Sequence, residues 1–525
     1  REHRTAGAPG CVAGAPPPRS LIWAGIRGDD DRATRDEGAP ARSGPTGRAG
    51  GGPQTALIAA VDVRIRAAAT EAWLTTLARL LESRGPQDAE QVFPGMIPAG
   101  LDHADLVTVR APRPGLILAT TRDIFNIDGT HELYREARRA YVALGAPEGI
   151  GLSEADEIHA TTLENREAVY RFFQQTLERP GDPEEEAVTL IDPEELRITE
   201  TGQVATSLGG RTVFDLVAAE LAPGLAALEE GRAGGRSAEI ADRVEAARDL
   251  AGYEPPAPTP AVFTGRYRRE GYRVERYFLE TPAYPIPFLL FVPDGPGPHP
   301  GIVYLAAEGK QSRVGRLDGL VREGFVVLAP DVVGVGELGP GDYQGHSYEF
   351  RVGRGSYAIW YLALFAGRSL VAMRAGDVVR SVAFLRSRGD VDDRSLTVLG
   401  ERGLATVGLH AAAFEEAIRR TVLVEPLLSY EALATSRYYD PGLIQETVAG
   451  ALPRYDLPDL VAALGARPVL MVDPRDELGQ PAPRDRVDSV YPGPRHEGLT
   501  VAHTGLWEDA WTGILAWLRR PDVAR

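Results

Sequence analysis

The sequence predicts the mixed α/β class, with two units that each contain a mostly parallel sheet flanked by helices. Short apolar runs alternate with amphipathic segments of helical spacing in two parts of the chain, and this alternation is typical of parallel sheets. A glycine-rich tract near residue 47 also returns near residue 400. With 525 residues, of which 43% are hydrophobic, the chain can bury more than one core.

The two glycine-rich tracts align without a gap: Gly47 falls on Gly400, 353 residues later, and Ile65 falls on Ile418. In the second tract an apolar run over 395–399 precedes the glycines, and an alanine-rich segment follows them. This order predicts a strand, a sharp turn and a helix. Such a turn requires small residues because it packs closely against its neighbours.

The first unit is expected over residues 46–178. Its predicted helices lie at 56–69, 70–81, 131–144 and 163–177, and its predicted strands lie at 113–123 and 149–154. The residues before Gly47 form a poor strand, so this unit is expected to be the C-terminal half of a larger domain. Residues 1–45 are expected to form a disordered or irregular tail, which an error of start site or reading frame upstream of about residue 50 would explain.

Residues 179–260 are expected to connect the units through a hairpin around Thr201 and Gly202, two helices at 213–230 and 237–250, and a stiff proline-rich linker. The second unit, 261–525, is expected to be complete. Its predicted strands lie at 273–280, 287–293, 300–306, 324–331, 395–400, 421–425, 467–473 and 498–503, and its predicted helices include 373–386 and 507–518.

The composition excludes several classes of protein. The formal net charge is −17, from 74 acidic and 57 basic residues, so nucleic acid is not an expected partner. The only cysteine is Cys11, which excludes an intrachain disulfide and a multi-cysteine zinc site. We expect no membrane span, because no apolar run reaches about 18 residues, and the first residues lack the layout of a signal peptide. The compartment and the oligomeric state do not follow from the sequence.

Each unit supplies a carboxylate and a histidine after consecutive predicted strands. In the first unit these are Asp123 and His159, and in the second they are Asp476 and His503. In a catalytic triad the acid orients the imidazole, which takes the proton of the nucleophile. Because the same order occurs twice after matching strands, we interpret both pairs as remnants of a triad. The neighbouring alternatives are Asp128, Asp473 and His496.

Both turns lack a serine at the nucleophile position. The pattern of a nucleophile elbow is Gly-x-Ser-x-Gly, but the central residue is Ala49 in the first tract and Arg402 in the second. Neither side chain can attack an ester, so the covalent route is closed. Ser43 precedes the first turn and Thr55 should lie within the following helix, so both are interpreted as structural residues.

No cofactor or metal is expected. The tract from Gly334 to Gly339 matches the dinucleotide-binding pattern, but Pro340 and Gly341 follow where a helix should begin. We therefore interpret this tract as a loop. The remaining histidines show no spacing typical of a zinc site.

Several tracts now carry a family resemblance. Residues 47–56, 100–106, 111–114, 121–125 and 154–159 resemble the C-terminal half of an acetyl xylan esterase-like bacterial α/β-hydrolase domain, and 329–337 resembles a loop of the same superfamily. Members with tandem domains commonly have a degenerate second elbow, which Arg402 fits. The resemblance implies that Ala49 stands at the nucleophile, Asp123 at the acid and His159 at the base. It also implies that Gly50 supplies an oxyanion amide.

The expected function is that of a carboxylic-ester hydrolase-like protein that acts on a small-molecule or carbohydrate ester by acyl transfer to water. The alternative is a pseudo-hydrolase that serves as a binding or scaffold protein. A peptidase of the prolyl-oligopeptidase kind would need a propeller of repeated strands, which the sequence does not predict.

Overall fold

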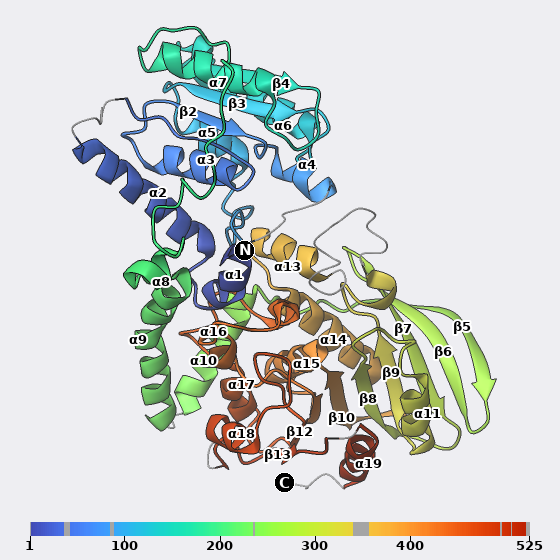
Figure 1. Ribbon diagram of the computed structural model, residues 1–525. Helices are drawn as coiled ribbons and strands as arrows, with labels where there is room; N and C mark the ends of the chain where they lie inside the picture. Colours follow the sequence, from blue (N-terminus) through green and yellow to red (C-terminus); the bar gives the residue numbers. More distant parts are fainter. Residues whose placement is uncertain are drawn as a thin grey trace. The chain divides into compact units, whose positions relative to one another are not determined.

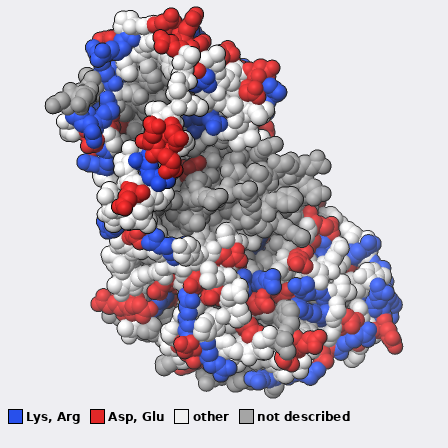
Figure 2. Space-filling model, in the orientation of Figure 1, with Lys and Arg blue, Asp and Glu red and all other residues white. Residues whose placement is uncertain are grey.

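The computed structural model (Figure 1) describes residues 2–35, 42–83, 89–234, 237–339, 356–493, 496–505 and 507–520. The chain divides into two compact units. The first contains Pro16–Leu216, and the second contains Ala8–Ala15, Val217–Ala363 and Gly367–Arg525. No helix among these described residues combines the length and the apolar character that a membrane crossing requires. On the face shown in Figure 2, acidic and basic side chains are interspersed over the described surface of each unit.

The first unit contains a four-stranded sheet in which all neighbouring strands are parallel. Its strands, in spatial order, are β1 (Thr46–Arg48), β2 (Ala68–Glu71), β3 (Gly115–Thr120) and β4 (Ile150–Ala155). Every residue of β2 and β3 is buried, because helices cover both faces. Figure 1 shows α7 (Leu163–Thr176) on one side of the sheet and α3 (Gly51–Val61) on the other. Between the strands and before β4 the chain also forms α4 (Leu77–Glu82), α5 (His103–Thr108), α6 (Ile127–Ala143) and η2 (Pro147–Gly149).

The N-terminal segment is helical, which corrects the expectation of an irregular tail. It forms α1 (Glu2–Val12) and α2 (Pro17–Thr34). Ile22 and Ile26 of α2 pack against a buried cluster that includes Ile58 and Ala68. In the second unit, the amide of Gly450 donates a hydrogen bond of 2.7 Å to the carbonyl oxygen of Cys11. The few apolar residues of this segment therefore pack against residues far away in the sequence, and such contacts cannot be predicted from amino-acid composition.

The connecting segment differs from the expectation in two ways. Within the described stretch 180–234 no hairpin forms around Thr201 and Gly202; a turn there leads into α8 (Val204–Leu208). A strand at this place would have no sheet to join, and Ile198 is accordingly 94% exposed. The predicted helices do form, as α9 (Val213–Gly234) and α10 (Ser237–Ala251).

The division between the units lies at Leu216 and Val217 rather than near residue 260, because α9 and α10 belong to the second unit. Arg232 of α9 and Arg243 of α10 both form ion pairs with Asp459, at 2.9 and 2.8 Å. The two helices are thus fixed to the second unit by charge as well as by packing.

The second unit contains a nine-stranded sheet in the spatial order β13-β12-β11-β10-β8-β9-β7-β6-β5. The pairs β5–β6, β6–β7 and β7–β9 are antiparallel, and the other neighbours are parallel. The strands are β5 (Ala261–Arg269), β6 (Tyr272–Glu280), β7 (Pro285–Pro293), β8 (His299–Leu305), β9 (Val326–Pro330), β10 (Val391–Glu401), β11 (Arg420–Val424), β12 (Val469–Val472) and β13 (Leu499–Ala502). The fold class predicted from the sequence is confirmed.

Helices cover both faces of the second sheet. One buried cluster joins apolar residues of the strands to Leu317 and Leu320 of α11 and to Ile514 of α19. Besides α9 and α10, this unit contains α11 (Val314–Arg322), η3 (Gly336–Leu338), α13 (Ser356–Phe365), α14 (Leu370–Arg386), α15 (Gly403–Phe414), α16 (Tyr430–Ala434), η4 (Pro441–Glu446), α17 (Leu457–Ala463), α18 (Arg484–Val490) and α19 (Trp507–Leu518).

Four neighbouring strands of each sheet share their order and register. In the first sheet one row of paired residues, at or near the carboxyl ends of the strands, consists of Arg48, Glu71, Leu118 and Ser153. The matching row of the second sheet consists of Glu401, Val424, Val472 and Ala502. The strands β1 to β4 therefore correspond to β10 to β13, row for row.

Candidate active site

The turn after β1 has the backbone of a nucleophile elbow. Ala49 adopts a φ of 52°, a left-handed conformation that a residue with a side chain rarely adopts, and α3 begins two residues later. Gly47 must be a glycine, because a methyl group there would lie 2.5 Å from the carbonyl oxygen of Gly51. The strained turn predicted from the sequence is therefore present, with a methyl group at its apex.

The turn after β10 repeats this geometry. Arg402 has a φ of 53°, and α15 begins at the next residue. A methyl group on Gly400 would lie 2.4 Å from the carbonyl oxygen of Leu404. The Arg402 Nε donates a hydrogen bond of 2.8 Å to the Glu425 carboxylate, so the apex of this elbow is an ion pair.

In the first unit the structure brings Asp123 and His159 together. The His159 Nδ1 lies 2.8 Å from the Asp123 Oδ1, and the Asp123 side chain is only 2% exposed. The other carboxylate oxygen of Asp123 accepts a hydrogen bond from the Thr120 hydroxyl at 3.0 Å. Because a carboxylate can only accept here, His159 donates from Nδ1, and its Nε2 is left as the basic nitrogen.

The loop that carries His159 is tied to the elbow. Arg48, the residue before Ala49, donates a hydrogen bond of 3.3 Å to the carbonyl oxygen of His159. Both segments leave the carboxyl ends of parallel strands, which places them at one edge of the sheet. Glu71 also ends its strand there; it accepts a hydrogen bond from the Thr161 hydroxyl at 3.0 Å, and burial raises its pKa.

Gly50 caps the N-terminus of α3, and a carboxylate that no sequence motif indicates lies beside it. A methyl group on Gly50 would lie 2.7 Å from the Glu90 Oε1. Glu90 comes after α4 in the sequence, outside any segment of periodic apolar spacing, so no sequence signal marks it. Its contact with the elbow is a feature of the fold.

In the second unit the expected pair is not formed. The Asp476 Oδ1 accepts hydrogen bonds of 2.9 Å from the amides of Leu478 and Gln480, within its own turn. The His503 Nε2 is buried and has no hydrogen-bond partner among the described residues. The shared register explains this difference: His503 directly follows Ala502, so its counterpart in the first sheet is Glu154 rather than His159.

The neighbouring alternatives do not form an acid–histidine pair within the described part of the chain either. Asp473 accepts a hydrogen bond of 2.7 Å from the amide of Thr504. Both ring nitrogens of His496 lie near backbone carbonyl oxygens, at 3.0 Å from Pro492 and 3.1 Å from Pro458. Asp128 lies in the first turn of α6.

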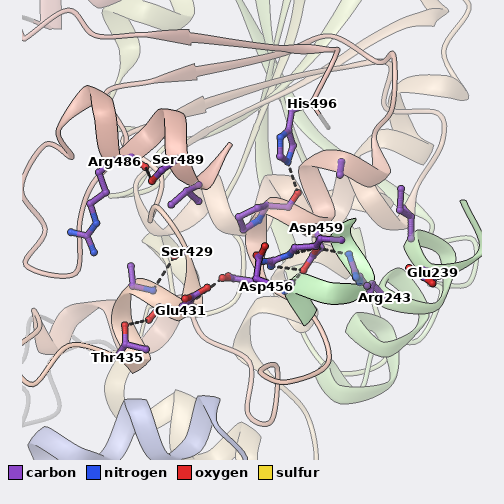
Figure 3. A pocket seen from close by; sticks show the side chains of 18 residues that line it. Glu239, Arg243, Ser429, Glu431, Thr435, Asp456, Asp459, Arg486, Ser489 and His496 are labelled. Carbon is purple, nitrogen blue, oxygen red and sulfur yellow. Dashed lines mark hydrogen bonds and ion pairs between the residues drawn. The ribbon is translucent and has the colours of Figure 1, made fainter. Parts of the chain in front are cut away.

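The second unit also contains a polar cavity of about 530 Å³, which is not lined by Arg402, Asp476 or His503. Figure 3 shows Asp456 and Asp459 in its lining, with Arg243 bonded to Asp459. Asp456 accepts hydrogen bonds from backbone amides of α16, and burial raises its pKa to about 6. These lining carboxylates are compensated within the protein, which indicates a structural role.

Comparisons with known proteins give only distant likenesses. No protein-family model matches the chain, and no curated protein matches it. Among solved structures, a Bacteroides fragilis protein assigned as an acetyl xylan esterase is 19% identical, with a TM-score of 0.41, over 52% of this chain and 76% of that chain. An acetyl xylan esterase from Paenibacillus sp. R4 is 19% identical, with a TM-score of 0.36, over 52% and 92% of the two chains.

A glucuronoyl esterase from Solibacter usitatus is 13% identical, with a TM-score of 0.37, over 53% of this chain and 91% of that chain. At these identities and TM-scores, the likenesses do not tell which activity this chain has.

Among the described residues no cluster of histidine, cysteine and acidic side chains could hold a metal ion.

Proposed function

We propose that this chain is a carboxylic-ester hydrolase-like protein whose first unit retains the acid and the base of a triad without the serine. The observation that carries this proposal is the Asp123–His159 hydrogen bond, on a loop tied to the strained elbow at Ala49. The elbow conformation is costly for a residue with a side chain, and such strain is typical of functional turns.

The chemistry open to this arrangement is direct attack by water. The His159 Nε2 would take a proton from a water molecule, whose oxygen would attack the ester carbon; the alcohol would then leave with that proton. The Gly50 amide would stabilise the oxyanion. A triad that loses its nucleophile retains only roughly 10³–10⁴-fold catalysis over water, so slow turnover is expected. The sequence resemblance favours an acetylated carbohydrate as the ester.

We further propose that the two units are tandem copies. The shared strand order, the shared register and the two elbows support this proposal. A second support lies in the capping boxes of α5 and α17: Asp102 accepts a hydrogen bond from the amide of Leu77, and Asp456 accepts one from the amide of Tyr430.

The alternative function is a pseudo-hydrolase that binds a partner or ligand without chemistry. The observation that favours it is the second elbow, where Arg402 is paired with Glu425 and the expected carboxylate, Asp476, bonds to its own turn instead of to His503. A scaffold would keep the fold of the elbow while losing the reacting groups.

Hydrolysis of p-nitrophenyl acetate by the full chain, compared with an Ala49→Ser variant, tests the proposal. We expect the variant to gain activity and to react with a fluorophosphonate probe, because the acid and the base are already in place. The matched control is Arg402→Ser, which puts a serine on the same backbone in the unit where Asp476 and His503 are not paired, and it should remain inactive. If Ala49→Ser also remains inactive while folded, the hydrolase proposal is wrong and the scaffold is favoured.

A further inference from the structure

The first turn of each elbow helix lies against a glutamate of the same unit. Glu90 lies against Gly50 in the first unit, with its carboxylate oxygens 2.7 and 3.1 Å from the position that a methyl group on Gly50 would take. In the second unit Glu446 lies against Gly403, the counterpart of Gly50, and its Cγ and Oε1 lie 3.2 and 3.4 Å from the corresponding position. A glutamate therefore lies against the same glycine in both units, although Glu446 ends η4 and Glu90 comes after α4.

Glu446 is fixed in its place by two side chains. It accepts a hydrogen bond of 2.9 Å from the Arg475 guanidinium and one of 3.1 Å from the Thr406 hydroxyl, which belongs to α15. It is also buried. This carboxylate is thus a built-in part of the second elbow.

Glu90 is placed by its neighbours in the chain. The side-chain oxygen of Gln91 accepts a hydrogen bond of 3.0 Å from the Trp73 indole, inside the protein. Ala89 and Val92 are both buried. The residues on both sides of Glu90 are therefore anchored, which fixes the backbone that carries its carboxylate.

The amide of Gly50, beside this carboxylate, is a group that ester hydrolysis needs. In a nucleophile elbow the amide of the residue after the nucleophile forms part of the oxyanion hole, and that residue is Gly50. The amide end of a helix favours one negative charge through its dipole and its unsatisfied N–H groups. A second anion at the same place would be repelled by the first.

We propose that Glu90 is an autoinhibitory residue, whose negative charge beside Gly50 disfavours an oxyanion at the first elbow and must be displaced or neutralised before an ester can react there. The effect of Glu90 on catalysis rests on the proposed function. Its effect on the binding of an anion at the start of α3 can be measured even if the chain is inactive. Glu90 would act only by inhibiting the site, and it would take no part in the reaction itself.

A binding measurement tests the exclusion without catalysis. In the full chain with Ala49 retained, Glu90→Gln keeps the shape of the side chain and removes its charge. Difluoromethylphosphonate, a tetrahedral anion, should bind this variant at least tenfold more tightly than the native chain, as followed by its ¹⁹F NMR signal. Glu136→Gln removes a charge from an exposed position of α6 and should bind like the native chain. Adding Gly50→Leu to Glu90→Gln should abolish the gain, because the new side chain fills the vacated place.

A kinetic measurement tests the consequence for the reaction. In the Ala49→Ser background, Glu90→Gln should raise kcat/KM for p-nitrophenyl acetate by at least tenfold, and Glu136→Gln should not. Equal phosphonate binding by the native chain and Glu90→Gln overturns the inference, as does an unchanged or lower kcat/KM in an active Ala49→Ser chain. If no serine variant is active but Glu90→Gln gains phosphonate binding, the hydrolase proposal fails and the exclusion of anions by Glu90 stands.

Discussion

Ala49 and Arg402 share a left-handed backbone, with φ values of 52° and 53°, at equivalent ends of β1 and β10. A non-glycine residue in this region costs roughly 1–3 kcal/mol and persists only where the surrounding structure enforces it. The enforcing contacts are alike in the two units, because Gly47 and Gly400 each lie against a carbonyl oxygen four residues later. The shape of the elbow is therefore a property of packing, and it survives the absence of serine.

The first prediction concerns that packing. Gly47→Ala should destabilise the first unit by about 1–3 kcal/mol, the usual cost of overpacking, because the new methyl group would meet the Gly51 carbonyl at 2.5 Å. The matched control is Gly51→Ala in the same turn, where a methyl group meets nothing within 4 Å and helix propensity should add up to about 1 kcal/mol of stability. Hydrogen exchange of β2 and β3 in the full chain measures both; equal protection in the two variants would contradict the prediction.

The second prediction concerns the acid. In the Ala49→Ser background, Asp123→Asn should lower kcat by about two to four orders of magnitude, because the amide no longer holds His159 in the tautomer that leaves Nε2 basic. Asp128→Asn, in the first turn of α6, should leave kcat within about twofold. Steady-state hydrolysis of p-nitrophenyl acetate distinguishes the two, and similar losses in both variants would mean that Asp123 is not the acid.

Much of this arrangement could be predicted from the sequence, since buried parallel strands produce apolar runs and the elbow requires glycines at fixed spacing. The pairing of Asp123 with His159 was also predicted and is formed, although their catalytic role stays a prediction. The second pair was misplaced because the loops after β3 and β12 differ in length and path, so Asp476 bonds to its own turn. Residue spacing does not record such differences, nor does it mark Glu90, whose placement depends on a contact between Trp73 and Gln91.

The third prediction concerns pH. Burial lowers the pKa of His103 to about 4, and its Nδ1 lies 2.9 Å from the carbonyl oxygen of Thr75. The unfolded chain protonates this histidine near its ordinary pKa of about 6.5, whereas the folded unit does not. The stability of the first unit is therefore fully present above about pH 6.5 and falls as the pH drops toward 4, by roughly 3 kcal/mol from this residue.

His103→Phe should flatten this pH dependence between pH 6.5 and 4, because a phenyl ring can still pack on Trp73 but cannot take up a proton. His131→Gln is the control in the same unit: the His131 side chain is 40% exposed and lies 2.6 Å from the Glu154 carboxylate, so its replacement should not remove the acid sensitivity that the buried His103 causes. The measurement is hydrogen exchange of β2 and β3 across this pH range. An unchanged slope in His103→Phe would show that another group controls the acid sensitivity of the unit.

The last prediction concerns the ion pairs that fix α9 and α10 to the second unit. Asp459 is buried and accepts hydrogen bonds from Arg232 and Arg243. Asp459→Asn should destabilise this unit by about 3–5 kcal/mol, because it leaves two largely buried guanidinium groups without their carboxylate. Asp488→Asn, at an exposed position of α18, should change stability by less than about 0.5 kcal/mol. Urea unfolding of the full chain compares them, and peptides from α9 and α10 should lose hydrogen-exchange protection first in Asp459→Asn. If protection is instead lost uniformly over the unit, Asp459 contributes to the core as a whole and not to the docking of these two helices.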